Sequence, residues 1–275
     1  MSANINIAEI VQAILLSGGL ATRLGELSKI LNKHLLPIAD WPMIYYPLWA
    51  IQEVGIKNVV VITGRDHPGQ IESQLGSGTI TERMNRDRAL FNLSIACVQQ
   101  DKPLGIAHAI GLAGPFISAP KILVVLGDNI FGGSIKPYLE EFVNQEIGAR
   151  VLLKEVPEPE HYGVPILEED RIARIIEKPR PPEWPNPPSN YAVVGGYFYH
   201  QSVFGEIPNV QPSGDKGERG VTDLNNIFAE QGQLEYNILP FDWEDAGKSP
   251  EELVRINNRM FDERRKATSF YPRIE

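Results

Sequence analysis

The sequence has only one cysteine among its 275 residues, Cys97. A single cysteine cannot form an internal disulfide, so the cysteine content does not indicate a secreted, disulfide-stabilised protein. Cys97 lies in the apolar segment 93–98, which we expect to be a buried strand. No catalytic motif surrounds it, so we interpret its thiol as a small core side chain rather than as a nucleophile.

Long apolar runs and an excess of basic residues are also missing. No run approaches the roughly 20 residues of a membrane-spanning helix, and the N-terminus lacks the basic and apolar segments of a signal peptide. The formal net charge is −9 and the pI is about 5.2, whereas a nucleic-acid-binding surface needs a basic footprint. We therefore expect a cytoplasmic protein without nucleic-acid or membrane partners.

What the sequence does contain is an alternation of apolar strands and amphipathic segments. Segments 11–16, 58–63 and 121–126 are short, continuous apolar runs, and segment 44–54 has helical spacing. Such runs separated by helices predict an α/β protein with a mostly parallel sheet covered on both faces. Ligands bind at the carboxyl ends of such strands. The glycines after 11–16 and the Gly127-Asp128 pair after 121–126 should therefore share one rim.

The second half of the chain has a different pattern. Segments 150–156, 171–177 and 191–199 are predicted strands, and the stretch 178–188 contains six prolines. Proline cannot join a helix interior or a central ladder, so this stretch should be an extended loop. Because the strand after it continues an apolar core, we interpret the loop as an excursion within one domain and not as a linker between two domains.

The first loop has the features of an anion site. Gly18 and Gly19 follow a predicted buried strand, and Arg23 and Lys33 come soon after. Glycines let backbone N–H groups approach phosphate oxygens, and the two cations can neutralise them. The letters match neither the dinucleotide fingerprint nor the P-loop, which argues against a dinucleotide-dependent oxidoreductase.

A series of motifs in order along the chain resembles the sugar-nucleotide pyrophosphorylases. The motifs are G-G-L-A-T-R-L at 18–24, N-K-H-L-L-P-I at 32–38, W-P-M-I-Y-Y at 41–46, V-Q-Q at 98–100, G-I-A at 105–107, L-G-D-N at 126–129, H-Y-G at 161–163, E-K-P at 177–179, S-N-Y-A-V at 189–193 and W-E-D-A-G at 243–247. The resemblance covers nearly the whole chain. It implies a Rossmann-like nucleotidyltransferase fold with a mixed, mostly parallel central sheet flanked by helices.

The resemblance also implies how the chain is organised. We expect a single domain over 1–275, with a nucleotide-binding half at about 10–130 and a sugar-binding half at about 131–248. A C-terminal helix should follow at about 249–265. The chain resembles the short form of the family, without the extra C-terminal helices that carry a second, regulatory nucleotide site in longer relatives.

The family's motifs assign a role to each matching position in this sequence. Catalytic cations are expected at Arg23, Lys33 and Lys178. Nucleotide-binding positions are expected at Gly18, Gly19, Thr22, Gln100 and Gly105. Sugar-binding positions are expected at Asn129, Tyr162, Gly163, Glu177, Val193, Tyr197 and Trp243. Magnesium ligands are expected at Asp128 and Asp245, because Mg²⁺ prefers hard oxygen ligands together with substrate phosphates and water.

The implied reaction is the attack of a sugar 1-phosphate oxygen on the α-phosphorus of a nucleoside triphosphate, which expels pyrophosphate. Resemblance favours dTTP and glucose 1-phosphate as substrates and dTDP-glucose as product, with Mg²⁺ and a homo-oligomeric enzyme of dTDP-sugar and polysaccharide biosynthesis. A uridylyltransferase or an enzyme for another hexose 1-phosphate is an alternative, because thymine and uracil differ by one methyl group. A non-catalytic nucleotide-sugar-binding regulator is the alternative from another class.

Four features depart from the family pattern. Ala21 stands where a glycine is usual, and Lys248 stands where threonine is expected. Segment 79–92 is longer than expected and is interpreted as an added surface helix. The proline-rich loop is also longer than expected and could reshape the sugar side of the site.

Overall fold

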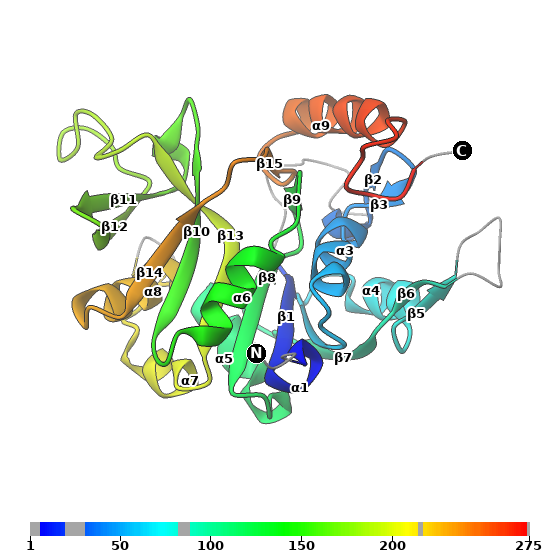
Figure 1. The fold of residues 1–275 in the computed structure, drawn as a ribbon, viewed down its shortest axis with the longest axis horizontal. Coiled ribbons are helices and arrows are strands. Elements are labelled where there is room, and N and C mark those ends of the chain that lie inside the picture. The colour runs from blue at the N-terminus through cyan, green and yellow to red at the C-terminus, as the bar shows by residue number, and fades with distance from the viewer. Residues whose placement is uncertain (1–5, 20–30, 82–88, 214–216, 274–275) are drawn as a thin grey trace, which may run out of the picture.

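The computed structural model describes residues 6–19, 31–81, 89–213 and 217–273. Its centre is a seven-stranded sheet in the order β14-β10-β13-β8-β1-β4-β7 (Figure 1). The strands are β1 (Val11–Ser17), β4 (Asn58–Thr63), β7 (Ser94–Gln99), β8 (Lys121–Leu126), β10 (Ala149–Glu155), β13 (Tyr191–His200) and β14 (Leu234–Ile238). β8, β1, β4 and β7 are parallel neighbours, while β13 pairs antiparallel with both β8 and β10. The prediction of a mixed, mostly parallel sheet is confirmed.

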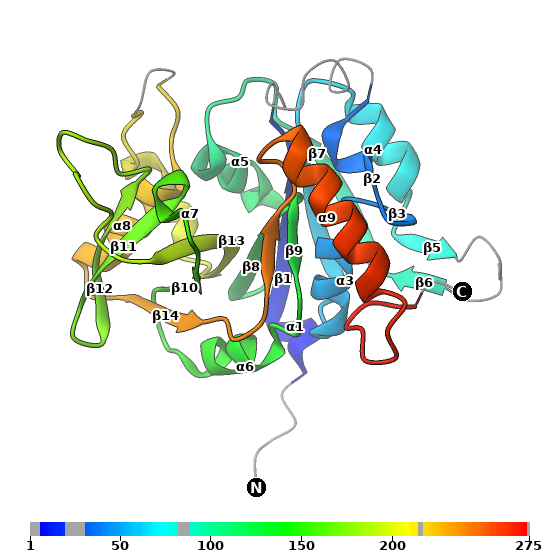
Figure 2. The ribbon, with the colours of Figure 1, turned by 90° about the horizontal axis from the view of Figure 1, so that it is seen from above.

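Helices cover both faces of this sheet, as Figure 2 shows from above. They are α1 (Ile7–Ile10), α3 (Tyr45–Glu53), α4 (Pro68–Leu75), α5 (Ile106–Ala113), α6 (Lys136–Asn144), α7 (Val203–Glu206), α8 (Val221–Glu230) and α9 (Pro250–Glu263). Short 3₁₀ turns lie at Lys33–Leu35, Gly114–Phe116, Pro159–His161 and Ile207–Asn209. None of the helices in the described ranges is long and apolar enough to cross a membrane.

Four two-stranded ribbons complete the fold. They are β2 (Pro37–Ile38) with β3 (Trp41–Pro42), β5 (Thr79–Thr81) with β6 (Ala89–Asn92), β9 (Asn129–Phe131) with β15 (Trp243–Asp245), and β11 (Gly163–Glu168) with β12 (Arg171–Glu177). The β11–β12 ribbon and α8 lie at one end of the central sheet, and the β5–β6 ribbon lies at the other (Figure 1). The β9–β15 ribbon joins a segment just after β8 to one just before α9.

The continuous apolar runs are explained by a core on each face of the sheet. Val59 and Val61 of β4 pack into the core beneath α3, α4, α6 and α9. Val60 and Ile62, the alternate residues, pack into the opposite core beneath α5 and α8. Successive side chains of a strand point to opposite faces, so a strand covered on both faces must be apolar throughout.

The prediction of an added surface helix in segment 79–92 is wrong. The described parts form the antiparallel pair β5 and β6, and residues 82–88 between them lie outside the described residues. Phe91 on β6 is fully buried and its ring lies 5.0 Å from Tyr45 and 6.0 Å from Trp41. An extended strand lets Phe91 join this aromatic cluster, and the burial of its ring favours the strand over a surface helix.

The prediction of a fully buried strand around Cys97 is also wrong in part. The strand is present as β7, but it lies at the edge of the sheet and its side chains alternate between exposed and half-buried. Cys97 itself is half-buried, and burial raises the pKa of its thiol to about 11. A protonated thiol is a poor nucleophile, which agrees with a packing role.

The predicted C-terminal helix is present as α9. Ser249 caps it by accepting a hydrogen bond from the Glu252 backbone N–H, with Pro250 at the first helical position. Just after the helix, the buried Arg264 pairs with Asp40, and its guanidinium lies 4.0 Å from the ring of Trp41. These contacts hold the end of α9 against the β2–β3 ribbon.

The proline-rich stretch is a loop without helix or strand, as predicted. It joins β12 to β13, and β13 lies inside the central sheet between β10 and β8. Strands from both predicted halves therefore share one sheet.

Candidate active site

A cavity of about 180 Å³ lies beside the carboxyl end of β8. Ten residues that the sequence singles out line it: Asp128, Asn129, Tyr162, Gly163, Glu177, Lys178, Val193, Tyr197, Trp243 and Asp245. They come from the turn after β8, from the β9–β15 ribbon, from the β11–β12 ribbon and the residues next to it, and from β13. The fold therefore gathers all the predicted sugar and metal positions, together with Lys178, around one cavity.

The other predicted positions lie elsewhere. Gly18 and Gly19 follow β1, Gln100 follows β7, and Gly105 precedes α5. Gly18, Gly19 and Gln100 therefore lie at the carboxyl ends of parallel strands of the same sheet, as the rim argument predicted for the two glycines. Arg23 and Thr22 lie outside the described residues, as does Ala21.

Lys33 and Asp128 form the charged centre of this rim. Lys33 Nζ lies 2.5 Å from Asp128 Oδ2, and each side chain is only 14% exposed. Burial by itself opposes ionisation of Asp128, but the charge of Lys33 and hydrogen bonds from Lys33 and Asn129 hold its pKa well below the usual range. Asp128 is therefore a carboxylate at neutral pH and can act as a ligand for a cation.

A close approach of the backbone keeps this ion pair in place. A Cβ on Gly247 would lie 2.4 Å from Asp128 Oδ2 and 2.9 Å from Lys33 Nζ. The Ala246 backbone N–H donates to the Asp128 carbonyl oxygen over 2.9 Å. Only glycine fits at position 247 without displacing the ion pair.

His34 is a buried residue next to this ion pair. Its ring is buried, and its Nδ1 lies 2.9 Å from Asn32 Oδ1, which also accepts from the His34 backbone N–H. Burial, reinforced by the charge of Lys33, lowers the pKa of His34 to about 3. The ring is neutral at physiological pH and fills space beneath Gly127, whose added Cβ would lie 2.7 Å from it.

Asp245 reaches the site through the β9–β15 ribbon. Asp245 pairs with Asn129 and Trp243 pairs with Phe131 across this ribbon. Alternate residues face opposite sides, so Asp245 and Trp243 line the cavity whereas Glu244 faces away from it. The Asp245 carboxylate also accepts from the Gly247 backbone N–H over 3.0 Å.

The two aspartates fit a magnesium site that substrate completes. The described residues include no group of three or more His, Cys, Asp and Glu side chains that would hold a metal by themselves. Mg²⁺ is commonly bound by one or two carboxylates plus substrate phosphates and water. The ionised, half-enclosed Asp128 and the neighbouring Asp245 match that donor set.

Asn129 is fully engaged with the protein. Its Nδ2 donates to Asp128 Oδ1 over 3.0 Å, and its Oδ1 accepts from the Gly195 N–H and from Trp243 Nε1 over 2.9 and 2.6 Å. The residue is 2% exposed. The Asn129 side chain thus connects the Asp128 carboxylate, β13 and the Trp243 ring. A direct contact of Asn129 with sugar stays a prediction.

Glu177 and Lys178 stand together at the end of β12. Lys178 Nζ lies 3.1 Å from Glu177 Oε1, and Thr222 Oγ1 donates to Glu177 Oε2 over 2.6 Å. Lys178 has a φ of +47°, a conformation that is rare for a residue other than glycine. Such strain is held only where surrounding contacts enforce it, here the hydrogen bond from its N–H to the Tyr162 carbonyl.

Aromatic side chains form the remaining wall. The rings of Tyr162 and Trp243 lie 5.3 Å apart in an edge-to-face arrangement. Burial, together with the carboxylates around them, raises the pKa of both Tyr162 and Tyr197 above the usual range, so their hydroxyls stay protonated. Lys248, which departs from the family pattern, donates a hydrogen bond from its Nζ to Glu158 Oε2 over 3.1 Å. Its Nζ also lies near the Tyr162 ring.

Sequence reasoning gave no role to several residues that line the cavity. Ile106, Leu126 and His161 lie within the quoted motifs, whereas Gly195, Val221, Thr222 and Asn225 were missed altogether. Thr222 and Asn225 lie on α8 and look like ordinary residues of an amphipathic helix. A signal existed for Gly195, because a glycine pair inside a strand suggests a close approach. A Cβ there would lie 2.5 Å from Asn129 Oδ1.

The family resemblance implies that Glu177 binds the sugar. On that assignment we expect Thr222→Val to raise the KM for the sugar phosphate about fivefold and to change kcat little, because one hydrogen bond that orients Glu177 is lost. Steady-state kinetics with varied sugar phosphate measure this. Thr222→Ser, which keeps the hydroxyl, is the control and should behave like the unaltered enzyme. An equal loss in kcat would contradict a role confined to sugar binding.

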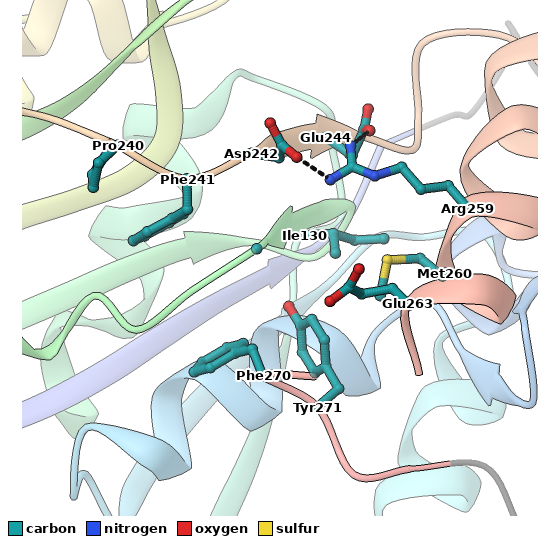
Figure 3. Close-up of a pocket in the computed structure, with 11 residues that line it drawn as sticks. Ile130, Pro240, Phe241, Asp242, Glu244, Arg259, Met260, Glu263, Phe270 and Tyr271 are labelled. Carbon is teal, nitrogen blue, oxygen red and sulfur yellow. Dashed lines mark hydrogen bonds and ion pairs between the residues drawn. The ribbon is translucent and has the colours of Figure 1, made fainter. Parts of the chain in front are cut away.

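A second cavity, of about 200 Å³, lies on the far side of the β9–β15 ribbon (Figure 3). Ile130 and Glu244, the ribbon residues that face away from the site, form part of its wall. Arg259 of α9 pairs there with both Asp242 and Glu244. These ion pairs join α9 to the ribbon that carries Asp245.

The sheet topology, the cation–carboxylate pair at its rim and the adjoining cavity define an α/β protein with a polar ligand site at the carboxyl ends of its strands. The nucleotidyl transferase family model matches residues 12–263, and the chain belongs to that family. It is 36% identical over 241 residues to a glucose-1-phosphate thymidylyltransferase of Neisseria meningitidis, covering 86% of this chain and 78% of that one. It is 30% identical to the low-salt glycan biosynthesis nucleotidyltransferase Agl11 of Haloferax volcanii, over 92% and 67% of the two chains.

Solved structures agree. A crystal structure from Bacillus anthracis, described as a putative glucose-1-phosphate thymidylyltransferase in complex with sucrose, superimposes with a TM-score of 0.79 at 40% identity, covering 90% of this chain and 94% of that one. A UDP-glucose pyrophosphorylase crystallised with UDP-glucose has a TM-score of 0.78 over 92% and 99% of the two chains. At 23% identity, the latter shows a shared fold.

Proposed function

We propose that this nucleotidyltransferase makes dTDP-glucose and pyrophosphate from dTTP and glucose 1-phosphate. The observation that carries the proposal is the placement of Lys33, Asp128 and Asp245 at one rim, directly beside a cavity lined by Glu177 and Lys178. The choice of substrates is supported by the glucose-1-phosphate thymidylyltransferase of Neisseria meningitidis, at 36% identity, and by the Bacillus anthracis structure described as a putative one, at 40% identity.

In this reaction an oxygen of the sugar phosphate bonds to the α-phosphorus. The bond from that phosphorus to the oxygen that bridges the α- and β-phosphates breaks, and this oxygen leaves as a terminal oxygen of pyrophosphate. No proton transfer is needed, because the attacking oxygen is already anionic. Catalysis must therefore come from positioning the two anions in line and from neutralising their charge. A chain of net charge −9 meets this need only by concentrating cations locally.

The residues divide that task. Lys178 is proposed to hold the attacking sugar phosphate, with Glu177 accepting hydrogen bonds from sugar hydroxyls and Tyr162, Val193 and Trp243 shaping the pocket. Lys33 and Arg23 are proposed to neutralise the triphosphate and the departing pyrophosphate. Gly18, Gly19, Thr22, Gln100 and Gly105 are proposed to hold the nucleoside and its phosphates.

Asp128 and Asp245 are proposed to hold Mg²⁺, which would neutralise phosphate charge in the complex. The ion pair of Lys33 with Asp128 also keeps the carboxylate ionised before substrate arrives. From the family resemblance alone, we also propose that the enzyme is a cytoplasmic homo-oligomer.

The test is pyrophosphate release from dTTP, UTP, CTP and GTP, each paired with several hexose 1-phosphates and Mg²⁺. We expect the highest kcat/KM for dTTP with glucose 1-phosphate, and no turnover when Mg²⁺ is removed with EDTA. Preference for UTP would reassign the enzyme as a uridylyltransferase, and absence of turnover with every pair would leave the regulatory alternative.

A further inference from the structure

The side chain of Gln100 is held in one orientation by two neighbours. Gln100 follows β7 and is 7% exposed, and its backbone N–H donates to the Thr63 carbonyl over 2.8 Å. Its side-chain Nε2 lies 3.2 Å from the Gly105 carbonyl oxygen and 2.8 Å from His108 Nδ1. Both neighbours lie at the start of α5.

The hydrogen-bonding capacity of these two neighbours determines which position of the Gln100 amide holds the nitrogen and which holds the oxygen. A carbonyl oxygen only accepts hydrogen bonds, so the amide atom that faces Gly105 must be the nitrogen. The second hydrogen of that nitrogen then meets His108 Nδ1, which must accept it. His108 is therefore neutral with its proton on Nε2. Burial, with the charge of Arg219, lowers the pKa of His108 and favours this neutral form.

The two acceptors are rigidly placed. Gly105 has a φ of +97°, and a Cβ there would lie 2.2 Å from the Arg219 carbonyl oxygen. That oxygen accepts from the Ala107 N–H, while the Arg219 N–H donates to the Leu104 carbonyl. The beginning of α5 is thus clamped against the segment around Arg219, and His108 cannot drift away from Gln100 without breaking these bonds.

The amide oxygen of Gln100, Oε1, faces Gly18. Gln100 Oε1 would lie 3.7 Å from a Cβ built on Gly18. Because both hydrogens of Nε2 are engaged, the side chain offers the space beside Gly18 an acceptor and no donor. This differs from the simple expectation that a glutamine amide would both donate to and accept from a base.

We propose that His108 is a positioning residue that fixes the Gln100 amide so that the enzyme selects pyrimidines carrying a ring N–H. Uracil and thymine present N3–H as a donor, whereas N3 of cytosine is an acceptor and would face Gln100 Oε1 with no hydrogen between them. This inference deepens the proposed function and rests on its placement of the base beside Gln100 and Gly18.

The kinetic experiment compares His108→Leu with His108→Asn, using dTTP, UTP and CTP with glucose 1-phosphate. Leucine fills a similar space without an acceptor, whereas asparagine places its Oδ1 near the position of Nδ1. We expect His108→Leu to lower the ratio of kcat/KM for dTTP over CTP about tenfold. Without the acceptor of His108, a flip that exchanges the oxygen and nitrogen of the Gln100 amide loses one hydrogen bond fewer. His108→Asn should keep that ratio within about threefold of the original.

A purely structural role for His108 would lower kcat/KM for every nucleotide alike and leave the ratio unchanged, which would overturn the proposal. A second measurement does not depend on turnover or on the variants folding. Long-range ¹⁵N–¹H spectra of the unaltered, ligand-free protein at neutral pH should show His108 as the Nε2–H tautomer. An Nδ1–H tautomer or an imidazolium would also overturn it. Absence of turnover by the unaltered protein, with the expected tautomer present, would instead count against the proposed function.

Discussion

Asp128→Asn is expected to reduce pyrophosphate release by about 10³-fold, with the fold retained. The substitution keeps the size of the side chain but removes the charge that meets Lys33 Nζ at 2.5 Å. It also weakens the proposed magnesium site, because a neutral amide oxygen is a poorer ligand than a carboxylate. The effect should fall mainly on kcat, since the lost interactions serve the charge that develops as pyrophosphate leaves.

The control for this substitution is Asp242→Asn. Asp242 precedes β15 on the same stretch of chain, but its carboxylate is exposed and pairs with Arg259 on the other side of the ribbon. Its loss should leave turnover within about twofold, as expected for an exposed ion pair. Circular dichroism and thermal unfolding are the measurements that check whether both variants fold. If Asp128→Asn is folded and keeps full Mg²⁺-dependent turnover, Asp128 is not part of the metal site.

Gly247→Ala is expected to lower kcat about 10²-fold, because misplacing reacting groups by about an ångström has an effect of that size. The added methyl group would lie 2.4 Å from Asp128 Oδ2, so the carboxylate or the backbone must move. Lys33 Nζ, 2.9 Å from the same position, would be displaced with it. No charge is removed in this variant, so it tests whether geometry at the ion pair matters independently of its charge.

Gly69→Ala is the matched control. It adds the same methyl group to a glycine in the first turn of α4, where a Cβ would meet nothing within 4 Å. Alanine favours helix over glycine, so stability should be unchanged or slightly higher and turnover unaffected. Equal kcat values for Gly247→Ala and Gly69→Ala would contradict this prediction. They would mean that the turn after β15 can shift to accommodate the methyl group, and that the close approach at Gly247 has no role in catalysis.

The local sequence predicted the parts of the fold whose apolar pattern is unambiguous. The runs 58–63 and 121–126 have side chains that suit burial on both faces, so they indicate central strands of a covered sheet without further information. Parallel strands share a carboxyl-terminal rim by geometry alone, which placed Gly18 and Asp128 on the same side. The six prolines of 178–188 likewise excluded a helix or a central strand in that stretch, independently of its tertiary surroundings.

Segment 79–92 and residues Thr222 and His108 show where such reasoning stops. The unusual length of the segment suggested an added surface helix, but Phe91 is buried in an aromatic cluster that only tertiary packing creates. Thr222 and His108 look like unremarked helix residues by sequence. Thr222 matters because it donates a hydrogen bond to Glu177, which is distant in sequence. His108 matters because it meets the side chain of Gln100, which lies outside the helix that carries His108.

The sequence by itself therefore determined the α/β class, the rim at which ligands bind and most of the chemical groups that line the site. The tertiary structure decided how those groups are oriented. The β9–β15 pairing brings Asp245 beside Asp128, Asn129 locks the carboxylate to Trp243, and His108 sets the direction of an amide. Side-chain identity is a local property of the sequence, but hydrogen-bond geometry depends on backbones that meet only after the sheet has assembled.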